Sequence, residues 1–224
     1  MPKIDNKDKI LIVDFGSQVT KLIARRIREQ KVYSEIVTSK DLGKIKDFSK
    51  IKGIILSGGP STVTKKKFPN IPKNIFYKNI PVLGICYGLQ LIAKVFGGKI
   101  KSQKKNREFG RAIIKKRSKS LLTENFYKKN SSVVWMSHQD VVYKIPKGFK
   151  KIASTKESEL TIIENKKNKI YGIQFHPEVT HTNNGRELIK NFIFLICKCS
   201  KNWKTYSEKN RIINDIKKTV KKDK

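Results

Sequence analysis

The stretch PVLGICYGLQLIAKVFGG, residues 81–98, places a cysteine between a short apolar run and an amphipathic run. The apolar run is typical of a buried parallel strand, and the residues after Cys86 repeat an apolar side at helical spacing. That side consists of Leu89, Ile92, Ala93 and Phe96, and Gly97-Gly98 would end the helix. Gly84 and Gly88 flank Cys86, where a tight strand-to-helix turn needs small neighbours. The stretch therefore predicts a strand and a helix joined by a sharp turn that carries Cys86.

The first half of the chain alternates between strand-like and helix-like segments. Strands are predicted at 10–13, 32–37, 53–57 and 81–85. A helical apolar repeat follows the first strand, at Val19, Leu22, Ile23 and Ile27, and Ser17 is predicted to cap its N-terminus. Strands that alternate with helices indicate βαβ units and a parallel sheet.

The second half contains short strand-like pieces separated by Pro, Gly, Asn and Lys. They lie at 109–117, 133–138, 140–145, 151–156, 160–165 and 169–175. We expect some antiparallel hairpins there, at least one strand that returns to the main sheet, and a closing helix at 185–197. The predicted fold class is α/β: a mostly parallel central sheet flanked by helices, with a smaller antiparallel β portion in the second half.

The bulk composition favours one large domain with an appendage. The chain has 224 residues, of which 38% are hydrophobic. No apolar run approaches the roughly 20 residues of a membrane span, and the N-terminus has no apolar signal-peptide core. Three cysteines do not make a disulfide framework. We therefore expect a reduced, cytoplasmic protein with no membrane association.

The formal net charge of +33 permits two interpretations. It could form an electrostatic surface for nucleic acid or another polyanion. Alternatively, it reflects compositional bias, because most of the 51 basic residues are lysine and they are spread along the chain. Without a nucleic-acid-binding motif we favour compositional bias, with only non-specific attraction to nucleic acid.

Cys86 is placed where an open α/β sheet binds ligands, at the carboxyl end of a strand. The G-x-C-x-G frame resembles the nucleophile elbow of α/β hydrolases, with cysteine in place of serine. At the N-terminal turn of a helix, the dipole would favour the thiolate. The alternative is a buried structural cysteine.

A thiolate nucleophile needs a base and a group that orients the base. In YGIQFHPEVTH, residues 171–181, His176 and Glu178 follow a strand-like run and lie two positions apart. In an extended segment this spacing puts both side chains on one side, as a Cys-His-acid triad requires. A core histidine is the alternative for His176.

Acyl transfer also needs donors for a tetrahedral oxyanion. The Gly58-Gly59 turn after a predicted strand and the amide of Tyr87 after the nucleophile could supply them. The alternative is an ordinary turn. The turn is not a P-loop, because no G-K-[ST] follows it.

Several motifs together resemble a known family. GGP, GICYGLQ and FHPE, in this order and spacing, resemble class I glutamine amidotransferase domains, whose fold is flavodoxin-like. The stretches DFGSQ, REFG, WMSHQD and GIQFHPEVTHTNNG are similar to the glutaminase domains of the GMP synthase family. This resemblance covers residues from about 9 to about 203.

The resemblance implies a role for each matching residue. Cys86 would attack the side-chain amide of L-glutamine, His176 would act as base and then as acid, and Glu178 would orient His176. Gly59 and Tyr87, with Gly58 beside them, would form the oxyanion hole. Further substrate contacts are implied at Gln90, Ser137, His138 and Asp140, with backbone contacts favoured in the loop 137–140.

The resemblance also implies a domain organisation. Residues 1–203 would form the amidotransferase domain, and the basic segment 204–224 would be a linker leading into an ATP-pyrophosphatase synthetase domain. No S-G-G-V-D-S type motif of that domain is present, so we expect a fragment or one subunit of a split enzyme. The ammonia would convert XMP to GMP. No cofactor or metal is expected here, whereas ATP and Mg²⁺ belong to the synthetase domain. The intact enzyme could also form a homodimer.

One loop position, the C-terminal tail and the choice of function need separate comment. Gln139 replaces a glycine usual in this loop, which puts the exact contacts of the loop in doubt if that glycine needs a positive φ. The tail should be frayed or only locally helical until a synthetase domain covers Ile212, Ile213 and Ile216. The alternative functions are an amidotransferase for another acceptor, of the anthranilate or aminodeoxychorismate type, and a basic nucleic-acid-binding protein without catalysis.

Overall fold

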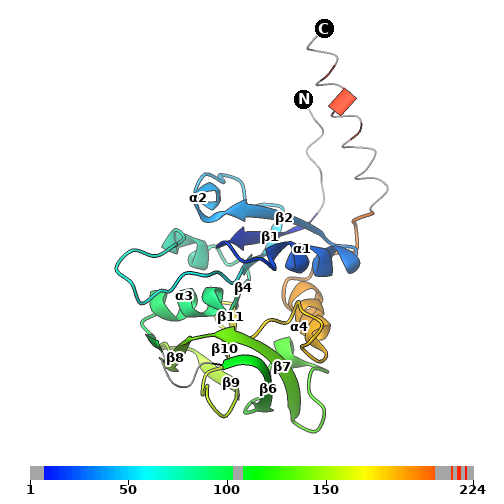
Figure 1. Cartoon of the computed structure of the whole chain (residues 1–224). Coiled ribbons are helices and arrows are strands. Elements are labelled where there is room, and N and C mark those ends of the chain that lie inside the picture. Colours follow the sequence, from blue (N-terminus) through cyan, green and yellow to red (C-terminus); the bar gives the residue numbers. More distant parts are fainter. Residues whose placement is uncertain (1–7, 103–107, 205–212, 214–215, 218–219, 221–224) are drawn as a thin grey trace.

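The structure is a computed structural model that describes residues 8–102, 108–204, 213, 216, 217 and 220. Within those residues, one sheet of nine strands runs through the molecule in the order β2-β1-β3-β4-β11-β10-β9-β6-β7. Figure 1 shows this sheet from β2 at the top to the β6–β7 pair at the bottom. The predicted α/β fold is confirmed.

The first five strands in this order are parallel. They are β2 (Tyr33–Thr38), β1 (Lys9–Asp14), β3 (Ile51–Leu56), β4 (Val82–Ile85) and β11 (Ile170–Ile173). The strand that returns from the second half is β11, which pairs in parallel with β4. The carboxyl ends of β3, β4 and β11 therefore meet at one edge of the sheet, where the site lies.

The smaller antiparallel portion expected in the second half is present, and most of its strands extend the same sheet. They are β10 (Ile162–Asn165), β9 (Lys150–Ser154), β6 (Glu108–Lys116) and β7 (Ser131–His138). Only β5 (Lys99–Ser102) and β8 (Asp140–Lys144) form a separate two-stranded sheet within the described residues. The turn between β7 and β8 connects the two sheets beside the site.

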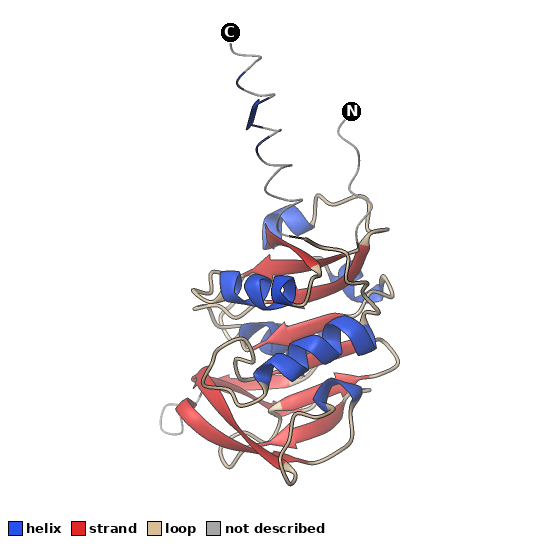
Figure 2. Ribbon diagram, turned by 90° about the vertical axis from the view of Figure 1, so that its right-hand side faces the viewer, coloured by secondary structure: helices blue, strands red, loops and turns tan. Residues whose placement is uncertain are grey.

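Helices cover both faces of the parallel half, as the view turned by 90° shows (Figure 2). Ile10 and Ile12 of β1 pack with α1 (Thr20–Glu29) and α4 (Gly185–Asn191). Leu11 and Val13, which alternate with them, pack with α3 (Tyr87–Val95) on the other face. The shorter elements are α2 (Ser39–Leu42), η1 (Lys73–Tyr77), η2 (Leu121–Thr123) and η3 (Phe192–Ile196).

Two local predictions need correction. Ser17 does not cap α1, because the helix begins at Thr20 and its cap position, Val19, makes no side-chain bond. The Thr20 hydroxyl instead donates to Asp14 Oδ1 at 2.7 Å, which holds the loop after β1. The closing helix at 185–197 is not regular, since α4 passes into the π-helical turn η3 at Phe192.

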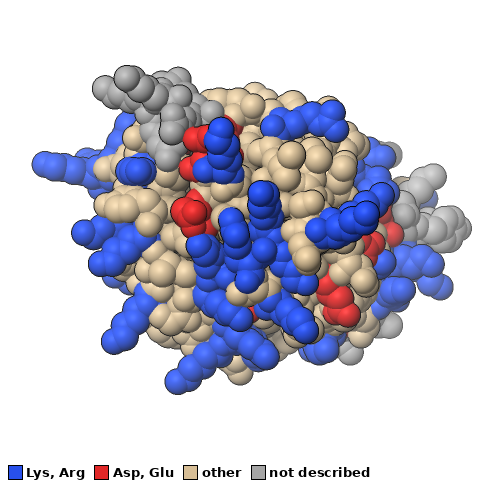
Figure 3. All heavy atoms as spheres, turned by 90° about the horizontal axis from the view of Figure 1, so that it is seen from below, with Lys and Arg blue, Asp and Glu red and all other residues tan. Residues whose placement is uncertain are grey.

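Lysine and arginine side chains are spread over the face seen from below, with only small acidic areas between them (Figure 3). This agrees with the distribution of the charges along the sequence, and it does not by itself point to a polyanion site. In the described part of the chain, every helix is too short or too polar to cross a membrane.

Candidate active site

Cys86 sits at the turn between β4 and α3, with φ 52° and ψ −103°. Non-glycine residues rarely adopt a positive φ, and such strain is common at functional sites. The turn is held by the Cys86 amide, which donates to Ile173 O of β11 at 2.7 Å. The sequence prediction of a sharp turn carrying Cys86 is confirmed.

The glycines around Cys86 are required by close backbone contacts. A Cβ on Gly84 would lie 2.4 Å from the carbonyl carbon of Gly88, and a Cβ on Gly88 would lie 2.4 Å from Leu56 O. Such distances are far below van der Waals contact. The helix α3 can therefore start directly above the sheet only because both positions lack a side chain.

His176 and Glu178 lie in the extended segment that follows β11. Nδ1 of His176 is 2.8 Å from Glu178 Oε1, and both side chains are buried. Thr182 Oγ1 donates to His176 O at 2.7 Å, and Arg26 Nε donates to Glu178 O at 3.0 Å. The predicted pairing of His176 with Glu178 is therefore present, and the backbone of the segment is fixed from two sides.

The pKa of His176 is raised from its ordinary value of 6.5 to about 10. Burial acts against this shift, but hydrogen bonds with Cys86 and Glu178, together with their negative charges, outweigh it. The arrangement thus favours an imidazolium next to the sulfur at neutral pH.

Gly58, two residues after the end of β3, lies close to both the histidine and the cysteine. A Cβ there would be 3.2 Å from His176 Cε1 and 3.7 Å from Cys86 Cβ. At Gly59 a Cβ would lie 2.6 Å from Phe15 O, so the loop passes too close for a side chain. In the described part of the chain, neither the Gly59 amide nor the Tyr87 amide makes a backbone hydrogen bond outside regular elements. The proposed role of these two amides in an oxyanion hole stays a prediction.

A cavity of about 640 Å³ opens above the sulfur. Its lining includes eight of the ten predicted residues: Gly59, Cys86, Tyr87, Gln90, Ser137, His138, Asp140 and His176. The other two predicted residues lie just outside this lining. Gly58 is next to the His176 ring, and Glu178 lines a neighbouring cavity. The volume suits a small polar molecule.

In the loop 137–140, the side chains of His138 and Asp140 are buried against the protein, whereas those of Ser137 and Gln139 are exposed. Gln90 Nε2 donates to Asp140 O at 2.9 Å, and the Asp140 carboxylate accepts from the Thr62 hydroxyl. The His138 side chain is buried, with Nε2 at 3.2 Å from Glu108 Oε2 of β6. The expectation that this loop presents backbone groups stays a prediction. Gln139 is not among the described residues with positive φ, so the turn between β7 and β8 tolerates it.

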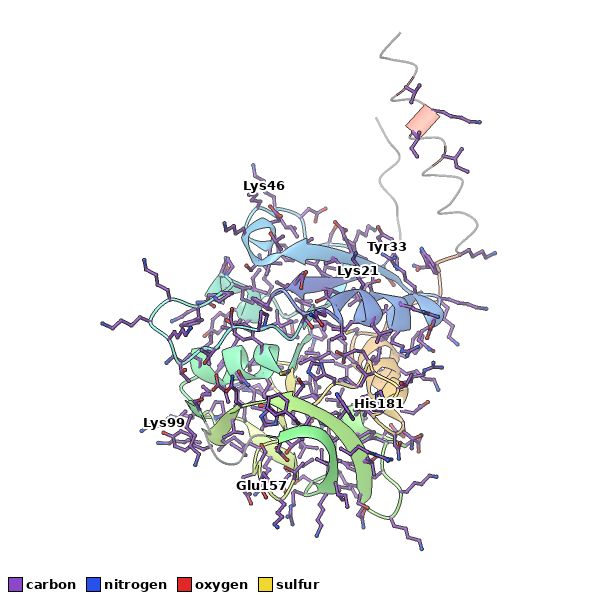
Figure 4. All side chains as sticks on the ribbon, viewed as in Figure 1. Lys21, Tyr33, Lys46, Lys99, Glu157 and His181 are labelled. Atoms are coloured by element: carbon purple, nitrogen blue, oxygen red, sulfur yellow. The ribbon has the colours of Figure 1, made fainter. Side chains whose placement is uncertain are left out.

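Two residues around the site were missed by the sequence reasoning. Gln174 is fully buried with Nε2 at 3.8 Å from Cys86 Sγ, and Glu108 pairs with His138 across β6 and β7. The period-two spacing of Gln174 and His176 was a signal that could have identified the first. His181, which Figure 4 labels beside α4, packs against Trp135 of β7, with ring centroids 4.5 Å apart and the ring planes tilted by 35°.

The other cysteines differ from Cys86. Cys197 and Cys199 are buried at the end of the closing helical segment, where burial raises the pKa of Cys197 and raises that of Cys199 to about 12. Among the described residues, no group of three or more His, Cys, Asp or Glu side chains is arranged to hold a metal ion.

The site thus combines a strained cysteine at a strand-to-helix elbow with a paired histidine and acid. The sequence that forms it matches a known family. The model for Glutamine amidotransferase class-I matches residues 11–196. The chain belongs to the class I glutamine amidotransferase family. Apart from the first two residues of β1, the match spans the described sheet, and it includes Cys86, His176 and Glu178.

The relatives of this amidotransferase domain point to one subgroup. A protein named GMP synthase [glutamine-hydrolyzing] from Brachyspira hyodysenteriae is 50% identical over 96% of this chain and 41% of its own length. The protein of the same name from Treponema denticola is 46% identical over 96% of this chain and 40% of its own length. The amidotransferase chain thus spans about two fifths of the length of these curated relatives.

Solved structures agree with the amidotransferase fold. A crystal structure described as that of a GMP synthase subunit from Thermoplasma acidophilum is 31% identical, with a TM-score of 0.73. The alignment covers 92% of this chain and 98% of that one. A glutamine amidotransferase from Thermotoga maritima, 23% identical with a TM-score of 0.64 over 77% of each chain, shares the fold.

Proposed function

We propose that this amidotransferase domain hydrolyses L-glutamine to glutamate and ammonia through Cys86, His176 and Glu178. The observation that carries the proposal is the strained Cys86 elbow beside an imidazole that Glu178 holds at 2.8 Å. A pKa of about 10 for His176 keeps the imidazole protonated beside the sulfur of Cys86 at neutral pH.

The first half of the reaction is acylation. The Cys86 thiolate attacks the carbonyl carbon of the glutamine side chain, and the oxyanion formed there accepts hydrogen bonds from the amides of Gly59 and Tyr87. His176 then donates its proton to the leaving nitrogen. The C–N bond breaks, ammonia leaves, and a thioester of Cys86 remains.

The second half is deacylation. The now neutral His176 takes a proton from water, whose oxygen attacks the thioester carbonyl. The C–S bond breaks, glutamate forms and the thiolate returns beside the imidazolium. Glu178 keeps Nδ1 protonated through both halves and so leaves Nε2 to exchange protons.

Glutamine would be held chiefly by the cavity wall. Gln90 and the loop 137–140 form one side of the cavity and are fixed to each other by the bond from Gln90 Nε2 to Asp140 O. The backbone groups of Ser137, His138 and Asp140 would then contact the α-amino and α-carboxylate groups of the substrate. In this proposal Gln90 contributes by positioning the loop as well as by lining the site.

The ammonia would serve a synthetase that uses ATP and Mg²⁺ to convert XMP to GMP. The names of the relatives support this acceptor over a chorismate-derived one. The synthetase, as a domain or a separate subunit, would be the partner, and the intact enzyme could form a homodimer. No support has appeared for a nucleic-acid-binding function without catalysis.

The proposed domain boundary lies after Trp203, whose amide donates to Lys31 O at 2.9 Å and ties the chain to the loop after α1. The predictions for the tail concern residues that mostly lie outside the described part. Ile213 and Ile216, which are described, are exposed and would be available to a synthetase domain.

The decisive experiment measures glutamate and ammonia from purified chain and glutamine, with and without a synthetase from a close relative. We expect slow hydrolysis alone and faster hydrolysis with synthetase, ATP and XMP, together with GMP formation. Hydrolysis that Cys86→Ala leaves unchanged would refute the mechanism. Stimulation by a chorismate-using partner instead of the XMP-using one would refute the acceptor.

A further inference from the structure

Gln174 lies directly after β11, two residues before His176, and its side chain is fully buried. Its Nε2 is 3.8 Å from Cys86 Sγ, within the range of an N–H donor and a sulfur acceptor. The backbone N–H of Gln174 donates to Thr161 O at 2.9 Å, so the main chain that carries this side chain is fixed. The contact with the sulfur therefore rests on a rigid support.

The burial of this amide is unfavourable unless the contact with sulfur offsets it. Within the described residues, Gln174 Oε1 is buried and has no hydrogen-bond partner. An apolar side chain of the same length would fill the space without an unpaired oxygen. A neutral thiol is only a weak acceptor, whereas a thiolate is a strong one, so the amide gains most when the sulfur is charged.

A second contact of the sulfur, with the carbonyl oxygen of Ser137, disfavours the thiolate that the Gln174 side chain would stabilise. Cys86 Sγ lies 3.7 Å from Ser137 O, and this carbonyl can accept a hydrogen bond from the neutral thiol but repels a thiolate. Ser137 and Gln174 thus favour opposite protonation states of one sulfur. We propose that Gln174 is a further catalytic residue, which stabilises the Cys86 thiolate by donating a hydrogen bond from Nε2 to the sulfur.

This role differs from that of His176. The imidazolium stabilises the thiolate only while it holds its proton, and the proposed reaction requires it to give that proton to ammonia. An amide does not titrate, so Gln174 keeps its donor throughout. In the proposed cycle the sulfur is a thiolate only while His176 holds its proton, so Gln174 would act alongside the imidazolium, both in the resting site and when the thiolate leaves at deacylation. The inference rests on the proposed nucleophilic role of Cys86.

The test is the pH dependence of Cys86 alkylation by iodoacetamide, followed by peptide mass mapping. Gln174→Met keeps the length of the side chain and removes the donor, so the alkylation midpoint should rise by about one pH unit. Gln174→Glu places a like charge beside the sulfur and should raise the midpoint further. Glutaminase kcat/KM of Gln174→Met should fall most at low pH and recover towards high pH.

A matched control separates this role from a structural one. Asn191 is also a buried amide, but it donates to Leu122 O and Glu124 O, remote from Cys86. Asn191→Leu should lower the stability without moving the alkylation midpoint. An unchanged midpoint in Gln174→Met, in protein whose circular dichroism matches wild type, would overturn the inference.

The outcomes also separate this inference from the proposed function. A wild-type Cys86 that is no more reactive than Cys197 and Cys199 would refute the nucleophile itself. If Cys86 is reactive in the wild type but its alkylation midpoint is the same in both Gln174 variants, only the role of Gln174 is refuted. If Gln174→Met does not fold, Gln174→Glu, which has nearly the same shape, provides the measurement.

Discussion

Arg26 of α1 donates from Nε to the backbone oxygen of Glu178 at 3.0 Å, across 152 positions of sequence. A helix near the N-terminus thus fixes the segment that carries the acid of the proposed triad. The Arg26 guanidinium is buried, and its Nη1 lies 3.1 Å from Glu29 Oε2. Alignment of His176 and Glu178 therefore depends on the position of α1.

Arg26→Met should lower glutaminase kcat by about tenfold, by analogy with partners behind metal ligands, whose removal costs about 10–100-fold. The side-chain stem is kept, but the bond to Glu178 O is lost. Arg25→Met is the matched control, since Arg25 pairs with the same Glu29 and is exposed. Equal kcat values for the two variants would show that the bond to Glu178 has no effect on catalysis.

A glutamine-mimicking electrophile should label Cys86 and leave Cys197 and Cys199 unmodified. Cys86 faces the cavity and pairs with His176, whereas burial raises the pKa values of the other two thiols. Peptide mass mapping after partial labelling distinguishes the three sites. Label distributed evenly over them would contradict the elbow assignment, and unfolded protein provides the positive control.

Substitutions in the proposed triad should differ in severity. Cys86→Ala removes the nucleophile and should abolish glutamine hydrolysis. Glu178→Gln keeps the shape but no longer stabilises an imidazolium, so kcat should fall by roughly a thousandfold without reaching zero. Initial rates of glutamate formation measure both. In an enzyme completed by a synthetase, Cys86→Ala should still make GMP from free ammonia, and its failure to do so would show that the damage is not local.

The stability of the domain should depend on pH through His176. Because the folded pKa is raised from 6.5 to about 10, protonated His176 stabilises the fold fully below about pH 6.5. This contribution is lost as the pH rises through 10. The difference in urea midpoint between wild type and His176→Gln should therefore be largest at pH 6 and shrink towards pH 10. Glu178→Gln removes one cause of the shift, so its own dependence over this range should be weaker than that of wild type.

Gly88→Ala should destabilise the domain by about 1–3 kcal/mol, because the new Cβ would lie 2.4 Å from Leu56 O and force α3 away from the sheet. Gly43→Ala is the control, since a Cβ there meets its nearest neighbours at 3.6 Å, an ordinary contact. Urea unfolding measures both variants. Equal unfolding midpoints would mean that α3 shifts without cost.

Most of the fold was predictable because short-range patterns determine it. The apolar run ending at Ile85 and the helical repeat after Cys86 each follow from periodicity, and the family resemblance placed His176 and Glu178 beside them. The contacts of Gln174 and Glu108 were not predictable. Each depends on which residues face each other across strands far apart in sequence. The period-two spacing before His176 indicates which side Gln174 faces, but not that Cys86 lies there.

The order of the strands in the sheet could not be predicted from the sequence either. Periodicity cannot show that β6 and β9 pair so that the antiparallel strands continue the parallel sheet. The Ser17 cap failed for a related reason: Asp14 binds Thr20, and the helix starts two residues later than the cap pattern suggests. Competing partners in the folded protein decide such cases.

The two glycines around Cys86 also bear on how such domains change over generations. A side chain at Gly84 or Gly88 would collide with backbone, so selection for a folded protein alone retains both, whether or not the thiol is used. Position 86 already carries a side chain, and glycine would relieve the strain of its positive φ. A descendant that had abandoned ammonia production would therefore be expected to keep both glycines and to replace the cysteine between them. In comparing descendants, the glycines would indicate common ancestry, and residue 86 would indicate whether the chemistry persists.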